Sequence, residues 1–95
     1  MTLQQLRYVI QIVQAGSINM AAQQLFITQP SLSKAVAELE HEMGITIFGR
    51  SNRGVTLTEE GTRFLSYARQ VVEQADLLEH QYKGEHRVRR VFGIS

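Results

Sequence analysis

The sequence predicts a mainly α fold in which three short helices and a small β-hairpin precede one long helix. Three observations lead to this prediction. Apolar residues recur at intervals of three and four in three short segments and again over residues 59–82, which is the period of a helix with one buried side. Residues 45–57 alternate β-branched and other residues about an Asn- and Gly-containing turn, a pattern typical of a hairpin. Gly16 and Gly44 follow helical segments, where a left-handed residue often ends a helix.

Residues 17–43 are expected to form the centre of the fold, as two short helices joined by a tight turn at residues 27–28. Ser17 and Thr28 precede the two helices, and each hydroxyl can accept a hydrogen bond from a backbone N–H one turn further on. Pro30 is tolerated in a first turn because its missing N–H would have no intrahelical partner. The buried side of the second helix is predicted from its apolar stripe, which contains Leu32, Val36, Leu39 and Met43.

The first helix of this pair is expected to pack closely against its neighbours. Ala21 and Ala22 are small enough to let a second helix cross over it. Leu25 and Phe26 are expected to close this helix against the core.

The opposite side of the second helix is polar and has no acid before Glu38. A helix whose N-terminal turn is rich in hydrogen-bonding groups suits insertion into a DNA major groove. On this segment alone, an ordinary helical hairpin with a solvated outer side explains the pattern equally well. The residues of this side are Pro30, Ser33, Lys34, Ala37 and His41, with Gln29 and Ser31 at the N-terminal end.

The first helix of the chain is expected to form one wall of the core. Thr2 and Gln5 fit a capping box, in which each side chain binds the other residue's backbone N–H. Arg7 and Tyr8 are expected on the surface without a specific role. The apolar repeat of this helix contains Leu3, Leu6, Ile10 and Val13, with Val9 beside them.

The hairpin at residues 45–57 would form a wing beside the two central helices, which makes the expected head a winged helix-turn-helix. Its tip has two cations, two hydrogen-bonding groups and no nearby acid. Arginines at such a tip can follow phosphates or enter a narrow, electronegative minor groove. The alternative is that both arginines are simply solvated on a loop and bind nothing. The preceding helix, which suits insertion into DNA, makes this alternative the less favoured one. The residues of the tip are Arg50, Ser51, Asn52 and Arg53.

Thr58 is expected to begin a long helix, with Glu59 and Glu60 in the first turn, where the helix dipole favours acids. Its apolar stripe starts at Gly61 and continues as a heptad-like seam. From residue 59 to residue 82 the helix would be roughly 36 Å long, too long for residues 1–58 to cover. We therefore expect a homodimer through this helix; a seam closed by a missing downstream domain is the alternative. The expected dimerisation residues are Phe64, Leu65, Ala68, Val71, Val72, Ala75, Leu78 and Tyr82.

The last residues are expected to leave the helix. Gly84 is predicted to end it, and residues 84–95 form a basic linker followed by a strand-like run at residues 91–94. We interpret this run as the edge of a second domain that the chain lacks.

Charge is distributed unevenly, although the net charge is only +1. Neither residues 1–37 nor residues 43–58 contain an acid, whereas five acids fall between residues 59 and 79. The front of the molecule is thus mildly positive and the back negative. A module that faces phosphates needs this polarity.

Composition argues against several other classes. No apolar run among the 95 residues is long enough to span a bilayer, and the start lacks a signal-peptide pattern. The absence of cysteine fits a reducing cytoplasm. His41, His80 and His86 lack metal-ligand spacing, and no glycine-rich phosphate loop follows a strand, so we expect no enzymatic activity, metal, cofactor or membrane partner. A winged-helix adaptor for proteins is the alternative function, but it would need an acidic or apolar outer side on the second central helix.

The chain resembles the N-terminal part of LysR-type bacterial transcriptional regulators over residues 3–82. Any one of the matching motifs is weak, but six in order at matching spacing are highly specific. They are L-x-x-L-x-x-V/F from Leu3, G-S-x-x-x-A-A-x-x-L at residues 16–25, T/S-Q-P-S-L-S at residues 28–33, L-E-x-E-x-G at residues 39–44, I-F-x-R-x-x-R-G-V-x-L-T at residues 47–58, and Gly61.

The resemblance implies a DNA-binding winged helix-turn-helix at residues 1–58, a linker helix at residues 59–83 that dimerises antiparallel, and a hinge at residues 84–95 before an effector domain. A small-molecule inducer would bind that domain, so the resemblance implies no cofactor here. It also implies a cytoplasmic, nucleoid-associated dimer on a roughly palindromic operator, and a tetramer of the full-length protein stays open. Family positions that meet bases or the adjacent backbone match Gln29, Pro30, Ser33 and Lys34, with Ser31 in the same turn; positions at the minor groove or phosphates match Arg50 and Arg53.

Two residues depart from the family pattern. Thr28 stands where Ser is commoner, which keeps the cap. Asn19 and Met20 replace a more usual hydroxyl-bearing pair, which weakens the case for a phosphate contact there, although Asn19 can still donate one.

Overall fold

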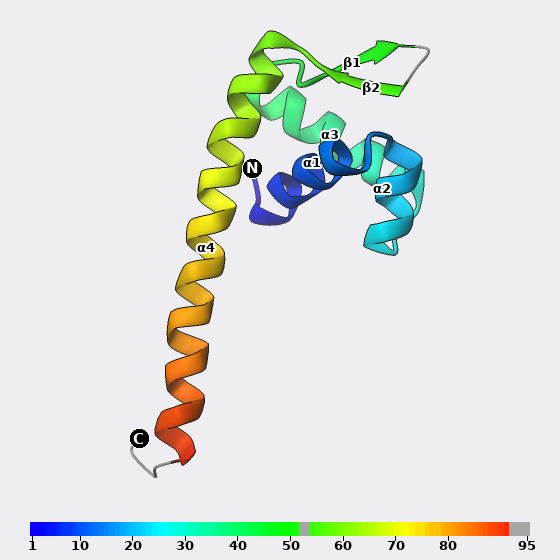
Figure 1. Cartoon of the computed structure of the whole chain (residues 1–95). Helices are drawn as coiled ribbons and strands as arrows, with labels where there is room; N and C mark the ends of the chain where they lie inside the picture. The colour runs from blue at the N-terminus through cyan, green and yellow to red at the C-terminus, as the bar shows by residue number, and fades with distance from the viewer. Residues whose placement is uncertain (52–53, 92–95) are drawn as a thin grey trace.

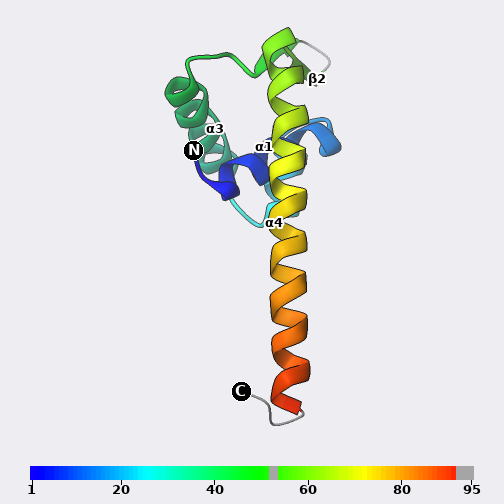
Figure 2. The same cartoon turned by 90° about the vertical axis from the view of Figure 1, so that its left-hand side faces the viewer.

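The computed structural model describes the backbone of residues 1–51 and 54–91 and the side chains of residues 1–49 and 54–83. Three helices and a two-stranded antiparallel hairpin form a compact head at residues 1–58, and one long helix, the rod, passes along it and extends beyond it (Figures 1 and 2). The mainly α, winged helix-turn-helix architecture predicted from the sequence is confirmed. The elements in order are α1 (Leu3–Ala15), α2 (Ile18–Leu25), α3 (Gln29–Met43), β1 (Phe48–Ser51), β2 (Gly54–Leu57) and the rod, α4 (Glu59–Val91).

The helix ends follow from local side-chain chemistry. Thr2 and Gln5 form the predicted capping box, with N–H···O distances of 2.9 and 3.1 Å. The Ser17 hydroxyl accepts from the N–H of Met20 at 3.0 Å at the start of α2. Gly16 and Gly44 end α1 and α3 with φ values of 80° and 70°, a conformation that glycine adopts without a Cβ penalty.

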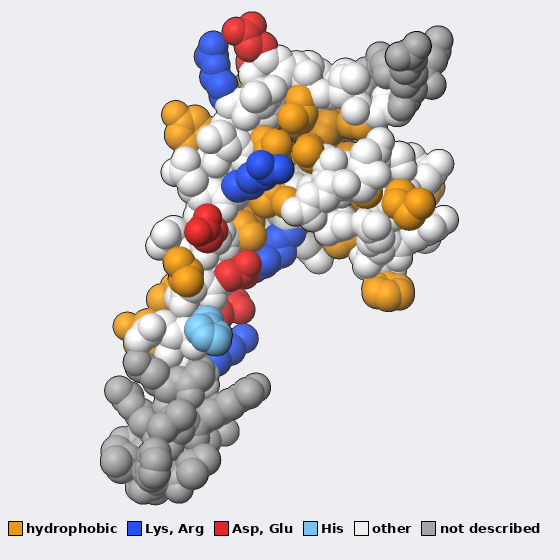
Figure 3. Space-filling view, in the orientation of Figure 1, with side chains coloured by type: hydrophobic (Ala, Val, Ile, Leu, Met, Phe, Trp, Pro, Cys, Tyr) orange, Lys and Arg blue, Asp and Glu red, His pale blue; other side chains and the backbone are white. Residues whose placement is uncertain are grey.

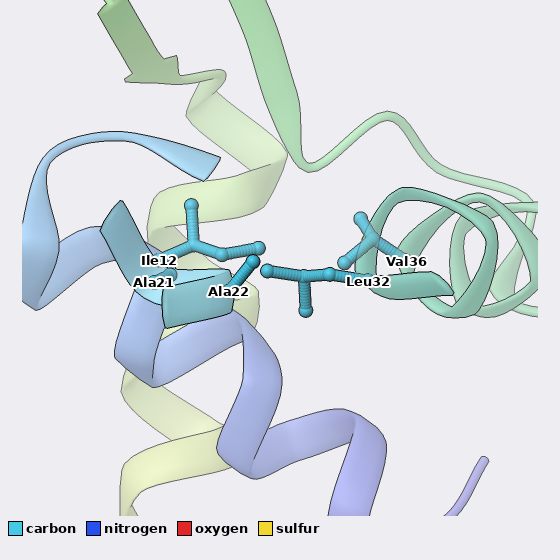
Figure 4. Close-up of a cluster of buried hydrophobic side chains, with 5 residues drawn as sticks. All are labelled: Ile12, Ala21, Ala22, Leu32 and Val36. Carbon is cyan, nitrogen blue, oxygen red and sulfur yellow. The ribbon is translucent and has the colours of Figure 1, made fainter. Parts of the chain in front are cut away.

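The first buried cluster holds the three helices of the head together. It joins Ile12 of α1, Ala21 and Ala22 of α2, and Leu32 and Val36 of α3 (Figure 4). Ile12 and Leu32 point toward the two alanines, whose small side chains leave room for both. The predicted role of these alanines is therefore confirmed.

The second buried cluster joins the head to the rod. It consists of Val9, Leu39, Ile47 and Leu65. Leu65 belongs to the rod, so part of the long apolar stripe is already covered by the head of the same chain.

Three details of the predicted core are wrong. Ile12 is fully buried although the predicted stripe of α1 omitted it, because a helix of this sequence can turn either of two overlapping apolar stripes inward. Met43 is 42% exposed, because no residue of the last turn of α3 after Leu39 is buried. Phe26 is 94% exposed rather than packed against the core. It ends α2 with a left-handed backbone (φ 59°), and this change of chain direction takes its side chain off the inner side of the helix.

The hairpin is fixed to the start of the rod by a close backbone contact. Its register pairs Phe48 with Leu57 and Ser51 with Gly54. The Thr58 N–H donates to the carbonyl oxygen of Ile47 at 3.0 Å. A Cβ at Gly61 would lie 2.0 Å from that same oxygen, so only glycine allows the rod to approach so closely.

The rod is longer than the sequence analysis predicted. It continues through Gly84 to Val91, so the prediction that Gly84 ends it is wrong. A glycine inside a helix costs only about 1 kcal/mol relative to alanine, which good helix-forming neighbours offset. The predicted strand at residues 91–94 falls almost wholly outside the described residues, and Val91 itself is helical.

Candidate nucleic-acid interface

The outer face of α3, which we define as Gln29, Pro30, Ser31, Ser33, Lys34 and Ala37, is accessible. All of these residues are exposed except Ser33, which is half-buried. Leu32, Val36 and Leu39 lie on the other side of the helix and are buried. The predicted division of α3 into a buried apolar side and an accessible polar side is therefore confirmed.

Hydrogen bonds within the first turns of α3 hold its polar side chains in place. The Thr28 hydroxyl accepts from the N–H of Ser31 at 3.2 Å, which makes Thr28 the N-cap, and it donates to the Ser31 hydroxyl at 2.8 Å. The Gln29 amide donates to the Ser33 hydroxyl at 2.8 Å. These bonds restrict the rotamers of the outer face before any partner binds, so Thr28 orders this turn rather than standing apart from it.

A groove runs between α3, the start of α2 and the hairpin. Its volume is about 430 Å³. Asn19 lines it from the first turn of α2, Gln29 and Ser33 from α3, and Gly49 and Val55 from the hairpin. Three segments that are separate in the sequence thus meet on one side of the head, and Asn19 lines the same groove as Gln29 and Ser33.

Among the described residues that line this groove, Glu40 is the one acid, and its carboxylate is bound to the backbone. Its Oε2 accepts from the N–H groups of Ile47 at 2.6 Å and Phe48 at 3.2 Å. Hydrogen bonds to a carboxylate are stronger than those between neutral groups. Glu40 therefore positions the entry of β1 beside α3. Glu40 was not predicted to be a functional residue, although it falls in the L-E-x-E-x-G motif.

The tip of the hairpin carries four predicted site residues. The structure describes the backbone of Arg50 and Ser51, which pairs with Val55 and Gly54. Their side chains, and the whole of Asn52 and Arg53, lie outside the described residues. The end of β1 lies remote from the rod (Figure 1).

The rod presents two different sides. Gly61, Leu65 and Ala68 are buried against the head, with Leu65 at 7% and Ala68 at 2% exposure. Val72 lines a groove between α1 and the rod. Leu65, Ala68 and Val72 were predicted to dimerise, but the first two are covered by their own chain and Val72 faces the head.

A second side of the rod carries an apolar stripe, which we call the rod stripe; Phe64, at its start, also packs against the second buried cluster. Its intervals are three, four, four, three and four, as in a heptad seam. Tyr67 was not predicted, but it fits this spacing and is 69% exposed. Figure 3 shows hydrophobic side chains along the side of the rod away from the head. The rod stripe consists of Phe64, Tyr67, Val71, Ala75, Leu78 and Tyr82.

Arg7 and Tyr8, which were assigned no role, both make tertiary contacts. Tyr8 packs against the first buried cluster. Arg7 forms an ion pair with Asp76 of the rod, with Nη2–Oδ1 at 2.7 Å and Nη1–Oδ2 at 3.5 Å. The hydrogen bond from Arg7 lowers the pKa of Asp76 and, reciprocally, raises the pKa of Arg7.

Two absences hold for the part of the chain that the structure describes. No group of three or more His, Cys, Asp or Glu residues there could hold a metal ion. No described helix is both long and apolar enough to cross a bilayer.

An outer helix face with an ordered N-terminal turn, an adjacent hairpin and a long helix defines a winged helix-turn-helix module. Residues 3–62, more than half of the chain, match the family described as bacterial regulatory helix-turn-helix protein, lysR family. The chain therefore belongs to the LysR family, whose members are transcriptional regulators rather than enzymes.

Individual relatives match beyond the head. The chain is 39% identical over 77 residues to the HTH-type transcriptional regulator ClcR of Pseudomonas putida, which covers 81% of this chain and 26% of that protein. It is 43% identical over 76 residues to the nitrogen assimilation regulatory protein nac of Klebsiella aerogenes, and this match covers 80% of this chain and 25% of that protein. The chain thus spans about a quarter of the length of these curated relatives.

Solved structures agree with this fold. The DNA-binding domain of CbnR in a DNA complex superposes with a TM-score of 0.82 at 32% identity, covering 90% of this chain and 99% of that one. The DNA-binding domain of BenM in complex with benA site 1 DNA gives a TM-score of 0.84 at 36% identity, and the match covers 90% of this chain and 97% of that one.

Proposed function

We propose that this chain is the sequence-specific DNA-binding part of a LysR-type transcriptional regulator. The observation that carries the proposal is the meeting of the outer face of α3, the start of α2 and the hairpin on one side of the head. Apart from Glu40, whose carboxylate is bound to backbone N–H groups, the lining residues that the structure describes include no acid. The DNA complexes of the CbnR and BenM domains, which share this fold, support it.

In the proposed complex, α3 enters the major groove with its N-terminal turns against the base edges. Gln29 uses one of its two amide N–H donors on Ser33, so its other N–H and its carbonyl oxygen can face an adenine. Lys34 is exposed one turn further on and would bind a base or an adjacent phosphate. Pro30 and Ser31 allow close approach to the DNA backbone.

The start of α2 would bind a phosphate. A helix N-terminus offers free backbone N–H groups and a positive dipole end. Asn19 is exposed in this turn and lines the groove beside α3. It can replace the hydroxyl that is more usual in the family at this point.

The hairpin would supply sequence-independent affinity and shape recognition. Arg50 and Arg53 would follow phosphates or enter the minor groove, with Ser51 and Asn52 between them. Because Glu40 fixes the entry of β1, the angle between hairpin and α3 is set before DNA binds.

Dimerisation would occur through the rod stripe. Val71, Leu78 and Tyr82 are 46%, 60% and 64% exposed, and a second rod packed antiparallel would bury them together with Phe64, Tyr67 and Ala75. Two heads would then reach two half-sites of a roughly palindromic operator. We propose residues 1–58 as the DNA-binding domain, residues 59–83 as the dimerising segment, and residues 84–95 as the link to an inducer-binding effector domain of a cytoplasmic regulator.

The proposal is tested by fluorescence anisotropy with a labelled duplex of random sequence, titrated over a series of salt concentrations. We expect binding whose logarithmic affinity falls linearly with the logarithm of salt concentration, with a slope of about −0.9 for each phosphate contacted. The variant Lys34→Ala is expected to bind more weakly with a shallower slope. If the wild-type chain does not bind the duplex at low salt, the proposal is wrong. Binding of a protein through the outer face of α3 instead would identify the chain as an adaptor.

A further inference from the structure

We propose that the ion pair between Arg7 and Asp76 sets the angle between the head and the rod, and through it the half-site spacing that a dimer accepts. The part of the inference that concerns half-site spacing rests on the proposed DNA-binding function. The part that concerns the angle between head and rod does not. Arg7 and Asp76 would be positioning residues: they stay away from DNA and determine where the outer face of α3 points.

The rod is anchored to the head at two levels. At its start, the carbonyl of Ile47 accepts from the N–H of Thr58 and lies against Gly61, where no side chain fits. Leu65 and Ala68 extend this contact by burial. Asp76 lies 15 residues beyond Gly61, or roughly 22 Å along the helix. Two points separated by this distance define the direction of a rod, whereas one point is a pivot.

Apolar packing is weak at the second level. An open groove of about 610 Å³ lies beside α1 and the rod there, lined by Ile10, Val72 and Leu77. Leu77 is 53% exposed. After Ala68 no described residue of the rod is buried, so at this level the forked contact between Arg7 and Asp76 ties the rod to α1. Figure 3 shows basic and acidic side chains gathered where the rod leaves the head.

The geometry of the pair suits this purpose. The two nitrogens of the Arg7 guanidinium face the two carboxylate oxygens at 2.7 and 3.5 Å. A two-point contact between planar groups restricts orientation as well as distance. The Arg7 and Asp76 side chains are 39% and 56% exposed, so the pair contributes little to the free energy of unfolding and can be removed without unfolding the head.

The angle is measured directly as a distance within one chain. The chain has no cysteine, so Gln23→Cys on α2 and Lys83→Cys on the rod can carry two spin labels. Labelled chains diluted with unlabelled wild type report only the head-to-rod distance by pulsed dipolar spectroscopy. Without the pair, the free arm starts at Ala68, the last buried residue of the rod, instead of Asp76, and its length up to residue 83 grows from roughly 10 to roughly 22 Å. The distance distribution should therefore widen about two-fold.

Two neutralising variants separate the pair from general electrostatics. Arg7→Gln removes a positive charge and Asp76→Asn a negative one, yet both should widen the distribution equally. Asp76→Glu keeps the carboxylate, so its distance distribution should stay as narrow as that of the wild type. Arg63→Gln and Glu59→Gln break an ion pair of 3.5 Å that lies wholly within the rod, and they should leave the distribution unchanged. An unchanged width in either neutralising variant, or widening in only one of them, overturns the proposal.

The consequence for DNA is measured with an inverted-repeat duplex obtained by selection and the same duplex with one base pair inserted between half-sites. Both neutralising variants should lower the affinity ratio for the two duplexes by about two- to five-fold, the range that a surface ion pair spans. A wild-type chain without any spacing preference would refute the proposed dimeric DNA binding, while the head-to-rod distance would still decide whether the pair sets the angle. Widened distances with an unchanged affinity ratio would overturn the link to spacing.

Discussion

The outer face of α3 and the rod stripe both lie on the surface and are largely exposed, but they are built for different partners. The outer face is polar, and its side chains are already bonded to one another, as between Gln29 and Ser33 at 2.8 Å. The rod stripe is apolar, and Tyr67, Leu78 and Tyr82 are all at least 60% exposed. Ordered polar groups suit a partner that is read by hydrogen bonds. An apolar seam at heptad spacing suits a second helix of the same kind.

The comparison also separates two sides of one helix. Leu65 and Ala68 are apolar like Leu78, but they are buried by the head of their own chain. Sequence spacing alone treats all three as one seam. The structure divides them because the head covers only the first turns of the rod and approaches from one side.

The largest expected effect breaks the rod stripe. Leu78→Lys should raise the dimer dissociation constant at least about 100-fold, because the symmetric interface would bury two unpaired charges at several kcal/mol each. Sedimentation equilibrium measures this. Leu77→Lys is the matched control, since Leu77 is similarly exposed (53% against 60%) but lies on another side of the rod. Equal dissociation in both variants, or none in Leu78→Lys, would remove the rod stripe from the interface.

The next effect concerns the outer face of α3. Gln29→Ala should relax base preference at one position of each half-site by about 1–3 kcal/mol, because a bidentate amide contact would be lost. Competition between matched and mismatched duplexes measures this difference. Gln23→Ala, which removes an exposed glutamine from α2, should leave the preference intact. If Gln29→Ala weakens binding to all sequences equally, Gln29 contacts only the backbone.

A smaller effect tests whether the outer face is ordered in advance. Thr28→Ala should lower the free energy of unfolding by about 1 kcal/mol through loss of the N-cap, measured by urea denaturation. Thr28→Ser keeps the hydroxyl and should lose less than half as much. Equal losses in the two variants would mean that the methyl group, and not the cap, carries the contribution.

A single charge on the outer face should matter less still. Lys34→Ala is expected to make the salt dependence of DNA affinity shallower by about 0.9 units of slope, as one phosphate contact is lost. Lys83→Ala removes the same charge from the rod, where its ion pair with Glu79 is intrahelical, and should leave the slope unchanged. If both variants change the slope alike, Lys34 acts through net charge and not through a contact. Arg53→Ala should behave as Lys34→Ala does if the hairpin tip reaches a phosphate.

The smallest effect is a pH dependence at the junction of head and rod. Arg7 lowers the pKa of Asp76 in the folded chain, so this pair stabilises the fold above the ordinary aspartate pKa and ceases to do so as pH falls through the lowered value. Melting temperatures of wild type and Asp76→Asn should therefore differ slightly near neutral pH and converge as pH falls through the lowered pKa of Asp76. A difference in melting temperature that grows as pH falls would contradict a lowered pKa of Asp76 in the folded chain.

Features that depend on neighbouring residues could be predicted from the sequence. The caps at Thr2, Ser17 and Thr28 and the left-handed glycines need only a few residues of context. The buried side of α3 followed from spacing, because one stripe is apolar and the other polar.

Features that depend on tertiary packing could not be predicted. Whether Ile12 or Ile10 faces inward depends on where the other helices lie, and the contact of Arg7 with Asp76 joins residues 69 positions apart. Phe26 was expected to pack against the core at the end of its helix, whereas its left-handed backbone turns it outward. The helical path through Gly84 reflects its helix-forming neighbours rather than the glycine itself.

The central claim is that two heads, joined by their rods, present the outer face of α3 to DNA. Sequencing the duplexes that the chain selects from a fully randomised pool tests it most directly. We predict enrichment of an inverted repeat whose half-site centres lie about 10 base pairs apart, or a multiple of that distance. Enrichment of an isolated half-site, or no enrichment at all, would contradict the account.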